Sequence, residues 1–119
     1  MKILLVEDDA PVAEFLAEAF REAGHQTTVT HSGEEALRIL RQETPEVVFL
    51  DLVLPKMNGI QVLEGIRLIN RTLPVIIVTA YPDLEDVAEA QQLGVAEVIE
   101  KPYVLKHYTD ALTRVSNTS

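Results

Sequence analysis

Four short apolar runs recur along the chain, and each is continuous rather than alternating with polar residues. Strands that are buried on both faces of a parallel sheet have this pattern. The runs cover residues 3–6, 47–50, 75–78 and, more weakly, 95–99. A fifth candidate, residues 26–30, is polar and β-branched, which suits a strand at an exposed sheet edge. The pattern therefore predicts five strands.

Helical patterns fill the gaps between these runs, because apolar residues recur there at helical spacing. The stripes are Val12, Phe15, Leu16, Ala19, Phe20 and Ala23; Ala36, Leu37 and Leu40; Ile60, Leu63, Ile66 and Leu68; and Leu105, Tyr108, Leu112 and Val115. We assign the Phe15 and Phe20 pair to the core. A further helix, the fourth along the chain, is predicted to begin at the cap residue Asp83 and to run to Leu93, before Gly94.

Five strands that alternate with five helices predict an α/β fold, a doubly wound (βα)5 flavodoxin-like sandwich of three layers with a parallel sheet. We expect the strand order 2-1-3-4-5, because only the second strand has the composition of an edge. The chain has no Pro/Gly/Ser-rich linker, internal repeat or low-complexity stretch, so residues 1–119 are interpreted as a single domain.

Composition narrows the functional classes. The formal net charge of −9 argues against nucleic-acid binding by this domain and favours cationic partners or a bound metal ion, although acidic surfaces also serve solubility. No apolar run approaches the ~20 residues that span a bilayer, and no signal peptide follows the first residue, so we expect a cytoplasmic protein without membrane contact. The absence of cysteine excludes disulfides, thiol catalysis and thiolate metal sites.

Polar side chains stand where the predicted strands end. They are Glu7, Asp8 and Asp9 after the first strand, Asp51 after the third, Thr79 at the end of the fourth, and Lys101 after the fifth. In such a sheet ligands bind beyond the carboxyl ends of the strands, so we expect these side chains to share one crevice. Carboxylate oxygens suit Mg²⁺, and a carboxylate can attack phosphorus to form an aspartyl phosphate. A lysine would neutralise phosphoryl oxygens, and a hydroxyl could donate one hydrogen bond.

These residues also carry a resemblance to a known family. The sequence resembles the response-regulator receiver family from end to end, through four motifs in the expected order. They are Leu5-Val6-Glu7-Asp8-Asp9, Asp51-Leu52-Val53-Leu54-Pro55-Lys56-Met57-Asn58-Gly59, Val78-Thr79-Ala80 and Lys101-Pro102. Each motif is weak alone, and the four together are highly specific.

The resemblance implies a Mg²⁺ site and a phosphoacceptor. Asp51 matches the phosphoacceptor and also a metal ligand. Asp8 matches a direct metal ligand, Glu7 is expected to act through water, and Val53 would offer its backbone carbonyl.

The same resemblance implies the residues around the phosphoryl group. Thr79 matches the switch hydroxyl, and Ala80 matches the small residue that leaves room for phosphate. Lys101 matches the lysine that pairs with phosphate, and the Lys101-Pro102 peptide bond is expected to be cis.

The implied function is a signalling domain rather than a turnover enzyme. It would take a phosphoryl group from a sensor histidine kinase or a histidine phosphotransfer protein and then switch its binding to an effector that the sequence does not identify. Residues 79–82 and the fourth-helix region look most like receivers of sporulation-type phosphorelays and nitrogen-regulator-like proteins. A complete stand-alone regulator and the front of a longer protein both fit this chain.

Four other functional classes compete with the receiver interpretation. A phosphatase of the haloacid dehalogenase type needs an aspartate two residues after the nucleophile, where this chain has Val53. Nucleotide-binding glycine motifs are absent, and the residues 7–9 would repel the phosphate of a flavodoxin cofactor. A receiver-like interaction module that works without phosphorylation stays open, because Val98 stands where family members often carry Tyr or Phe. Taken singly, Asp9 can be a helix cap and Lys101 a solvated charge.

Overall fold

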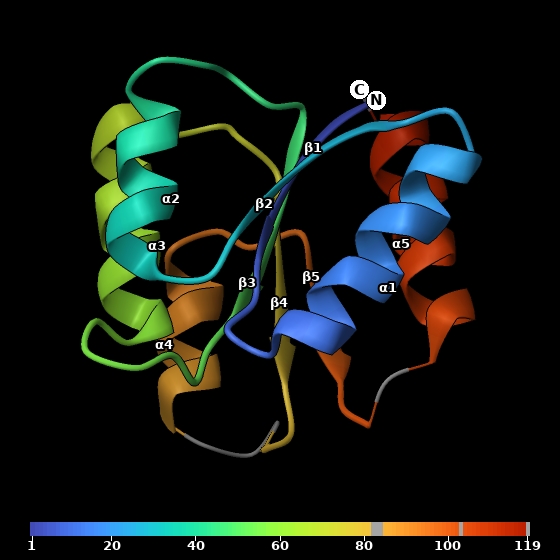
Figure 1. The fold of residues 1–119 in the computed structure, drawn as a ribbon. Helices are drawn as coiled ribbons and strands as arrows, with labels where there is room; N and C mark the ends of the chain where they lie inside the picture. The colour runs from blue at the N-terminus through green and yellow to red at the C-terminus, as the bar shows by residue number, and fades with distance from the viewer. Residues whose placement is uncertain (82–84, 103, 119) are drawn as a thin grey trace.

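The computed structural model describes residues 1–81, 85–102 and 104–118. Five parallel strands form one sheet in the order β2-β1-β3-β4-β5, as the sequence predicted (Figure 1). The strands are β1 (Lys2–Val6), β2 (Gln26–Thr30), β3 (Val47–Asp51), β4 (Val75–Thr79) and β5 (Glu97–Glu100). The sequence placed the fifth strand too early. Leu93 and Gly94 form the turn after α4, where Gly94 has a left-handed φ of 80°, and Val95 and Ala96 lie between this turn and the strand, so that regular pairing with β4 begins at Glu97.

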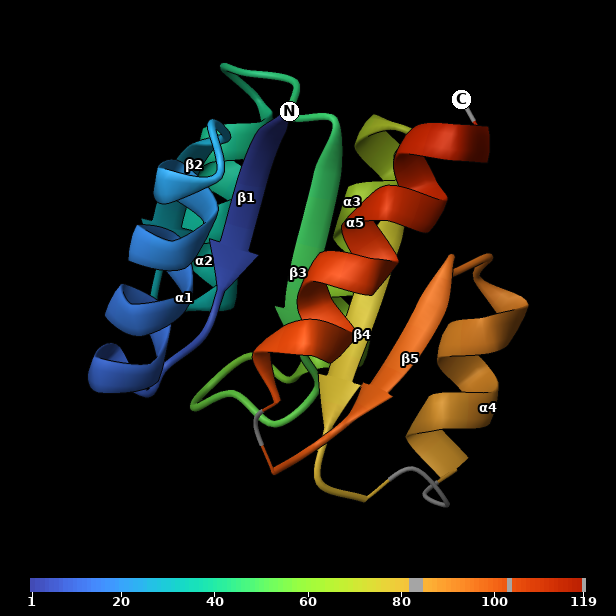
Figure 2. The same cartoon turned by 90° about the vertical axis from the view of Figure 1, so that its right-hand side faces the viewer.

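The helices cover both faces of the sheet (Figures 1 and 2). They are α1 (Ala10–Glu22), α2 (Gly33–Leu40), α3 (Gly59–Ile69), α4 (Glu85–Gln92) and α5 (Leu105–Thr118). The helices α1 and α5 lie on one face, and α2, α3 and α4 lie on the other. The predicted cap of the fourth helix, Asp83, lies outside the described residues.

Each face of the sheet has its own hydrophobic core, because successive strand residues point to opposite faces. Leu50 and Ile77 pack toward α2, α3 and α4. Phe49 packs toward α1 and α5, where its ring lies 5.3 Å from that of Phe20 and 5.5 Å from that of Tyr108, measured between ring centroids. Every residue of β3 and β4 is buried, which explains why their apolar runs are continuous.

Three residues assigned to apolar stripes are exposed instead, namely Ala23 and the two large side chains of Phe15 and Leu68. Phe15 is 56% exposed and Leu68 is 90% exposed. In α1 the buried side is formed by Ala13, Leu16, Ala17 and Phe20. Phe15 follows Ala13 by two residues, about 200° around the helix, and Leu68 follows the buried Ile66 by the same angle. The core assignment is therefore right for Phe20 and wrong for Phe15.

Local caps fix the segments that leave the strands. The Asp9 side chain accepts a hydrogen bond from the backbone N–H of Val12 and so caps α1. Asn58 and Gln61 form a reciprocal capping box at the start of α3. A Cβ atom on Gly59 would lie 2.5 Å from the Cα of Leu52, so only glycine lets α3 begin this close to the end of β3.

Candidate functional site

The strands that lead to the predicted site residues all end at one edge of the sheet, where the strand arrows point in Figure 2. Asp51 ends β3, and Glu7 and Asp8 follow β1, which is the neighbour of β3 in the sheet. Glu7, Asp8 and Asp51 each offer a carboxylate oxygen, and these oxygens lie within 4.8 Å of one another. Glu7 and Asp51 are buried, whereas Asp8 is exposed, so the cluster opens to solvent on one side.

Lys101 joins this cluster from the end of β5. Its Nζ donates a hydrogen bond of 2.7 Å to Oδ2 of Asp51 and lies 3.4 Å from Oε1 of Glu7. Burial is the largest single influence and opposes the charge on the ammonium, but the hydrogen bonds and the charges of Asp51 and Glu7 together outweigh it and raise the pKa of Lys101. The lysine therefore stays charged beside two buried carboxylates. The predicted cis peptide bond between Lys101 and Pro102 is confirmed.

The Asp51 carboxylate is held at both oxygens. Oδ1 accepts a hydrogen bond of 2.9 Å from the backbone N–H of Val53, and Oδ2 accepts the one from Lys101. The side chain of Val53 is itself 57% exposed. Asp51 thus has a fixed orientation next to a side chain that faces solvent, which is a suitable arrangement for a nucleophile that must be reached from outside.

The carboxyl group of Glu7 has a raised pKa. Burial is the largest cause, and a hydrogen bond to Asp51 and the charge of Asp51 add to it, so that the pKa of Glu7 rises to about 7. The charge of Lys101 and a hydrogen bond from the backbone N–H of Asp9 act in the opposite direction. Near neutral pH a large share of Glu7 therefore keeps its proton, and a cation bound to the cluster would displace it.

The donor set fits a hard divalent cation. All three side chains offer oxygen, two of them are fixed by burial, and the exposed third leaves room for water ligands. Mg²⁺ prefers one or two carboxylates together with several waters. The backbone carbonyl of Val53, which the sequence proposed as a further ligand, stays a prediction.

Thr79 lies next to the cluster, but its hydroxyl is engaged in its own loop. On β4, Val78 pairs with Asp51, so Thr79 lies one residue farther toward the carboxyl edge. The Thr79 side chain is buried, and its Oγ1 accepts a hydrogen bond of 3.0 Å from the backbone N–H of Tyr81. Ala80, between them, is exposed. Because a hydroxyl can donate one hydrogen bond while it accepts another, this bond does not use the hydroxyl proton, which can serve an acceptor at the site.

His31 supports the site, and the sequence assigned it no role. Its Nδ1 lies 2.9 Å from the backbone oxygen of Glu7, and the N–H of Glu7 donates to the backbone oxygen of Thr30. Both contacts fix the backbone that carries the acidic pair. The sequence holds one indication of this role. His31 directly follows the second predicted strand, residues 26–30, and so lies at the carboxyl end of a strand.

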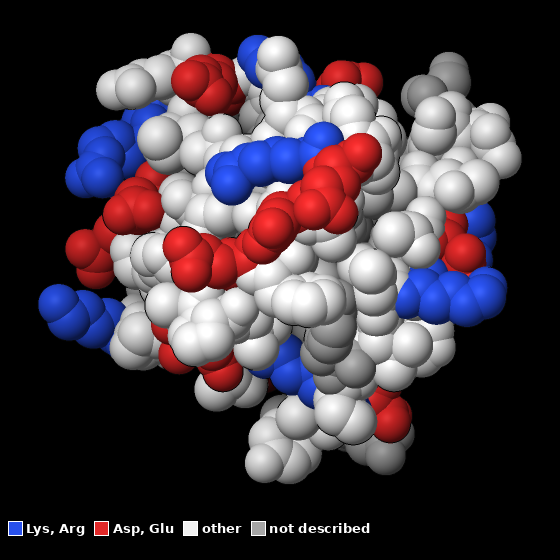
Figure 3. Space-filling view, turned by 45° about the vertical axis from the view of Figure 1, so that its right-hand side comes forward, with Lys and Arg blue, Asp and Glu red and all other residues white. Residues whose placement is uncertain are grey.

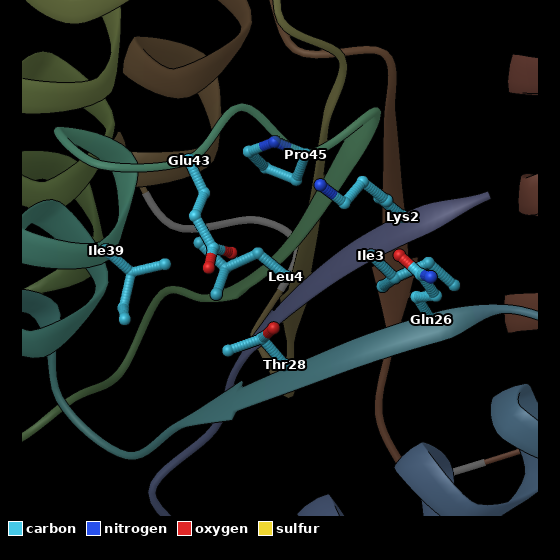
Figure 4. Close-up of a pocket in the computed structure, with 8 residues that line it drawn as sticks. All are labelled: Lys2, Ile3, Leu4, Gln26, Thr28, Ile39, Glu43 and Pro45. Atoms are coloured by element: carbon cyan, nitrogen blue, oxygen red, sulfur yellow. The ribbon is translucent and has the colours of Figure 1, made fainter.

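A separate hollow of about 290 Å³ lies at the opposite edge of the sheet, among β1, β2 and the end of α2 (Figure 4). Leu4 and Ile39 give it an apolar floor, and Lys2 and Glu43 stand at its rim with exposed side chains. It lies at the amino ends of the strands, away from the carboxylate cluster. The hollow is therefore not part of the site formed by Glu7, Asp8 and Asp51.

Comparisons with known proteins agree with the geometry. The sequence model of the response regulator receiver domain family matches residues 3–113. Sporulation initiation phosphotransferase F of Bacillus subtilis is 35% identical over 113 residues, which cover 95% of this chain and 91% of that protein. The DNA-binding response regulator MtrA of Mycobacterium tuberculosis is 39% identical over 102 residues, covering 86% of this chain but only 44% of that protein.

A solved structure extends the comparison to three dimensions. The non-phosphorylated HemR receiver domain of Leptospira biflexa superposes with a TM-score of 0.89 at 34% sequence identity, covering 96% of this chain and 92% of that one. Among the residues that the structure describes, no helix has the length and apolar character needed to cross a membrane.

Proposed function

The chain belongs to the response regulator receiver domain family, the phosphate-accepting signalling modules of two-component systems, and we propose that its phosphoacceptor is Asp51. The surroundings of the Asp51 carboxylate support this assignment. Asp51 is buried at the end of a central strand, it belongs to a cluster of three acids, and Lys101 donates to it at 2.7 Å.

Phosphoryl transfer to Asp51 requires one bond to form and one to break. A carboxylate oxygen of Asp51 attacks the phosphorus of a phosphohistidine on the partner, the P–N bond breaks, and its electron pair stays on the imidazole nitrogen. The N–H of Val53 orients the carboxylate by holding Oδ1. Lys101, already in contact with Asp51, is in place to pair with an oxygen of the arriving phosphoryl group.

Glu7, Asp8 and Asp51 are proposed to hold Mg²⁺, with the carbonyl of Val53 as a further ligand. When bound, the ion would neutralise phosphoryl oxygens and the charge of the acids. Asp8 is the ligand most open to solvent, and the buried Glu7 would lose its proton as the ion binds.

Thr79 is proposed to report the phosphorylated state. Its hydroxyl would leave the N–H of Tyr81 and donate instead to a phosphoryl oxygen. The exposed Ala80 leaves space for that group. Because Tyr81 belongs to the segment that leads into α4, the exchange would move the start of that helix. This is a two-state element that phosphorylation can bias.

A sensor histidine kinase or a histidine phosphotransfer protein is the proposed donor, and we expect it to contact the rim around Asp51. The start of α1, at Ala10, Pro11 and Val12, lies beside the acidic pair. Pro102 lies on the other side, and we expect Tyr103, which is outside the described residues, to belong to the same contact surface. An encircling contact is needed because the donor histidine must come within bonding distance of Asp51.

The outer face of α1 adds a preference for a basic donor surface. Glu14, Glu18 and Glu22 are exposed at successive turns, beside Arg21. Figure 3 shows a row of acidic side chains with one basic side chain next to it. Like charges four residues apart destabilise a helix slightly, so the row does not serve folding, and it would attract a basic surface on the donor.

The alternative, a receiver-like module that works without phosphorylation, is not favoured. Such a module would be expected to lose the acidic pair, Asp51 or Lys101, and this chain brings all of them together. The assignment of residues 1–119 to a single domain and the cytoplasmic location stay predictions. The effector is not identified.

Incubation with acetyl phosphate and Mg²⁺, followed by intact mass, tests the assignment. The protein should gain one phosphoryl mass, and Asp51→Asn should gain none. Asp86→Asn, in α4, is the matched control and should be labelled like the wild type. Equal labelling of Asp51→Asn would reject Asp51 as the phosphoacceptor.

A further inference from the structure

Arg67, near the end of α3, donates hydrogen bonds to four backbone carbonyls. Nε donates to Leu93 at 2.7 Å and Nη2 donates to Gly94 at 2.9 Å. Nη1 is shared between Leu73 at 2.8 Å and Asn70 at 3.2 Å. These carbonyls belong to the end of α3, to the loop before β4 and to the segment that ends α4. One side chain therefore ties three segments together.

The charge of Arg67 is used for these carbonyls rather than for an ion pair. Among the described residues, no carboxylate lies within ion-pair distance of its guanidinium. Burial lowers the pKa of Arg67 below its usual value, which shows that the group is partly withdrawn from water. The carbonyl end of a helix carries partial negative charge, and a planar guanidinium can bond several carbonyls at fixed angles.

At its carboxyl end α4 also has apolar contacts, because Ala90 is buried and Leu93 packs against the core. Of the eight residues of α4, Val87 and Ala90 are buried. Its first turn carries Glu85 and Asp86, and its last turn has no basic residue. Arg67 thus supplies, from α3, the positive charge that the carboxyl end of α4 lacks in its own sequence.

We propose that Arg67 is a positioning residue that anchors the carboxyl end of α4, so that the helix pivots there when its amino end follows Thr79. The two ends of α4 are held by contacts of different kinds. In the described part of the loop before α4, the N–H of Tyr81 donates to the hydroxyl oxygen of Thr79, and the proposed switch breaks this bond. The carboxyl end has two bonds from a charged donor.

This inference rests on the proposed function, because the pivot acts only if phosphorylation recruits Thr79. Displacement should then be largest at Glu85 and should decline along the helix to Leu93. Because Gly94 is held by the same guanidinium, the strand β5 beyond it would be shielded from the movement. The anchor thereby directs the response to the loop after β4 and to the amino half of α4.

NMR of the ¹⁵N-labelled protein with Mg²⁺, before and after addition of beryllofluoride, tests the pivot. Amide shifts should be large at Thr79, Tyr81 and Glu85 and small at Leu93 and Gly94. The Nε–H signal of Arg67, a direct reporter of its bond to Leu93, should keep its position and its slow exchange with solvent. This readout does not depend on any variant folding correctly.

Variants sharpen the test. Arg67→Met should spread the beryllofluoride-induced shifts through Leu93, Gly94 and into Glu97–Glu100. Arg67→Lys, which keeps the charge but loses the planar donors, should give an intermediate result. Arg71→Met is the matched control, because Arg71 is exposed a few residues away, and it should respond like the wild type.

Two results would overturn the proposal, and they are distinguishable. If Thr79 responds but Leu93, Gly94 and the Nε–H of Arg67 move as much as Glu85, the anchor is wrong and the phosphoacceptor function stands. If no amide responds and acetyl phosphate adds no mass, the proposed function fails and the pivot fails with it.

Discussion

The centre of the sheet and the region of α4 and β5 are built differently. Every residue of β3 and β4 is buried, whereas β5 buries Ile99 and leaves Glu100 exposed. The helix α3, which follows β3, has a reciprocal capping box and buries five residues, and α4 buries two. Asp51 thus stands on the firmly packed part of the molecule, and the segment proposed to move, at the start of α4, lies where fewer residues are buried.

Core substitutions should show this contrast most strongly. Phe49→Ala removes a fully buried ring that contacts Phe20 and Tyr108, and it should lower the free energy of unfolding by about 3–5 kcal/mol. Val87→Ala in α4 removes less buried surface and should cost clearly less. Urea unfolding of both variants is the measurement. Equal losses would show that α4 is as firmly packed as the centre.

The acidic cluster should make the metal-free protein less stable as pH rises. The pKa of Glu7 is about 7 in the folded protein, above its usual 4.5, so this contribution to stability is complete below pH 4.5. It is lost as pH rises through 7, because the unfolded chain releases the proton earlier. The loss should total about 3 kcal/mol.

Urea unfolding in EDTA between pH 5 and pH 8 measures this effect. Mg²⁺ should reverse much of the decline, since the ion replaces the proton of Glu7. Glu7→Gln is the control, and its stability should vary much less over the same range. Stability of the metal-free wild type that rises over this range would contradict the protonated state inferred for Glu7.

Loss of the exposed ligand should weaken Mg²⁺ binding while sparing the rigid centre. Asp8→Ala is expected to reduce Mg²⁺ affinity about 10- to 100-fold, measured by isothermal titration calorimetry. Because one of three repelling acids is gone, the metal-free variant should be no less stable than the wild type. Asp9→Ala is the comparison, since Asp9 serves as the cap of α1, and it should alter stability more than affinity.

The smallest effect concerns the lifetime of the phosphorylated state. Val53 has no polar atom in its side chain to orient a water molecule, and Tyr81 is an exposed ring in the loop after Thr79. Decay of the purified phosphoprotein should therefore be slow, and Val53→Asn should speed it several-fold, less than the roughly 10²–10⁴-fold that a positioned group contributes to proton transfer. Slower decay in Val53→Asn would count against this role.

Much of the central region could be predicted from the sequence, because its signals are local. Continuous apolar runs identified the central strands, and Asp51, Glu7 and Lys101 were found as the polar residues that end such runs. The topology then brought them together without further information. The exposure of Phe15 was missed because a stripe of apolar residues at mixed spacings does not fix the angle at which each one points.

The α4 region was harder to predict because its contacts are not local. Nothing near Arg67 in the sequence indicates that its guanidinium bonds Leu93 and Gly94, which lie 26 and 27 residues away. The early start assigned to the fifth strand has a related cause, since Val95 is apolar because it packs against the core from the segment just before β5. Residue propensities cannot distinguish such a packed segment from a strand.

Chemical trapping of the phosphorylated residue tests the central claim most directly. Borohydride reduces an aspartyl phosphate to homoserine, and tandem mass spectrometry of the digested protein locates that residue. After treatment with acetyl phosphate and Mg²⁺, homoserine should replace aspartate at position 51 and at no other acid. Homoserine at position 8, or at any site with Asp51 intact, would contradict the account.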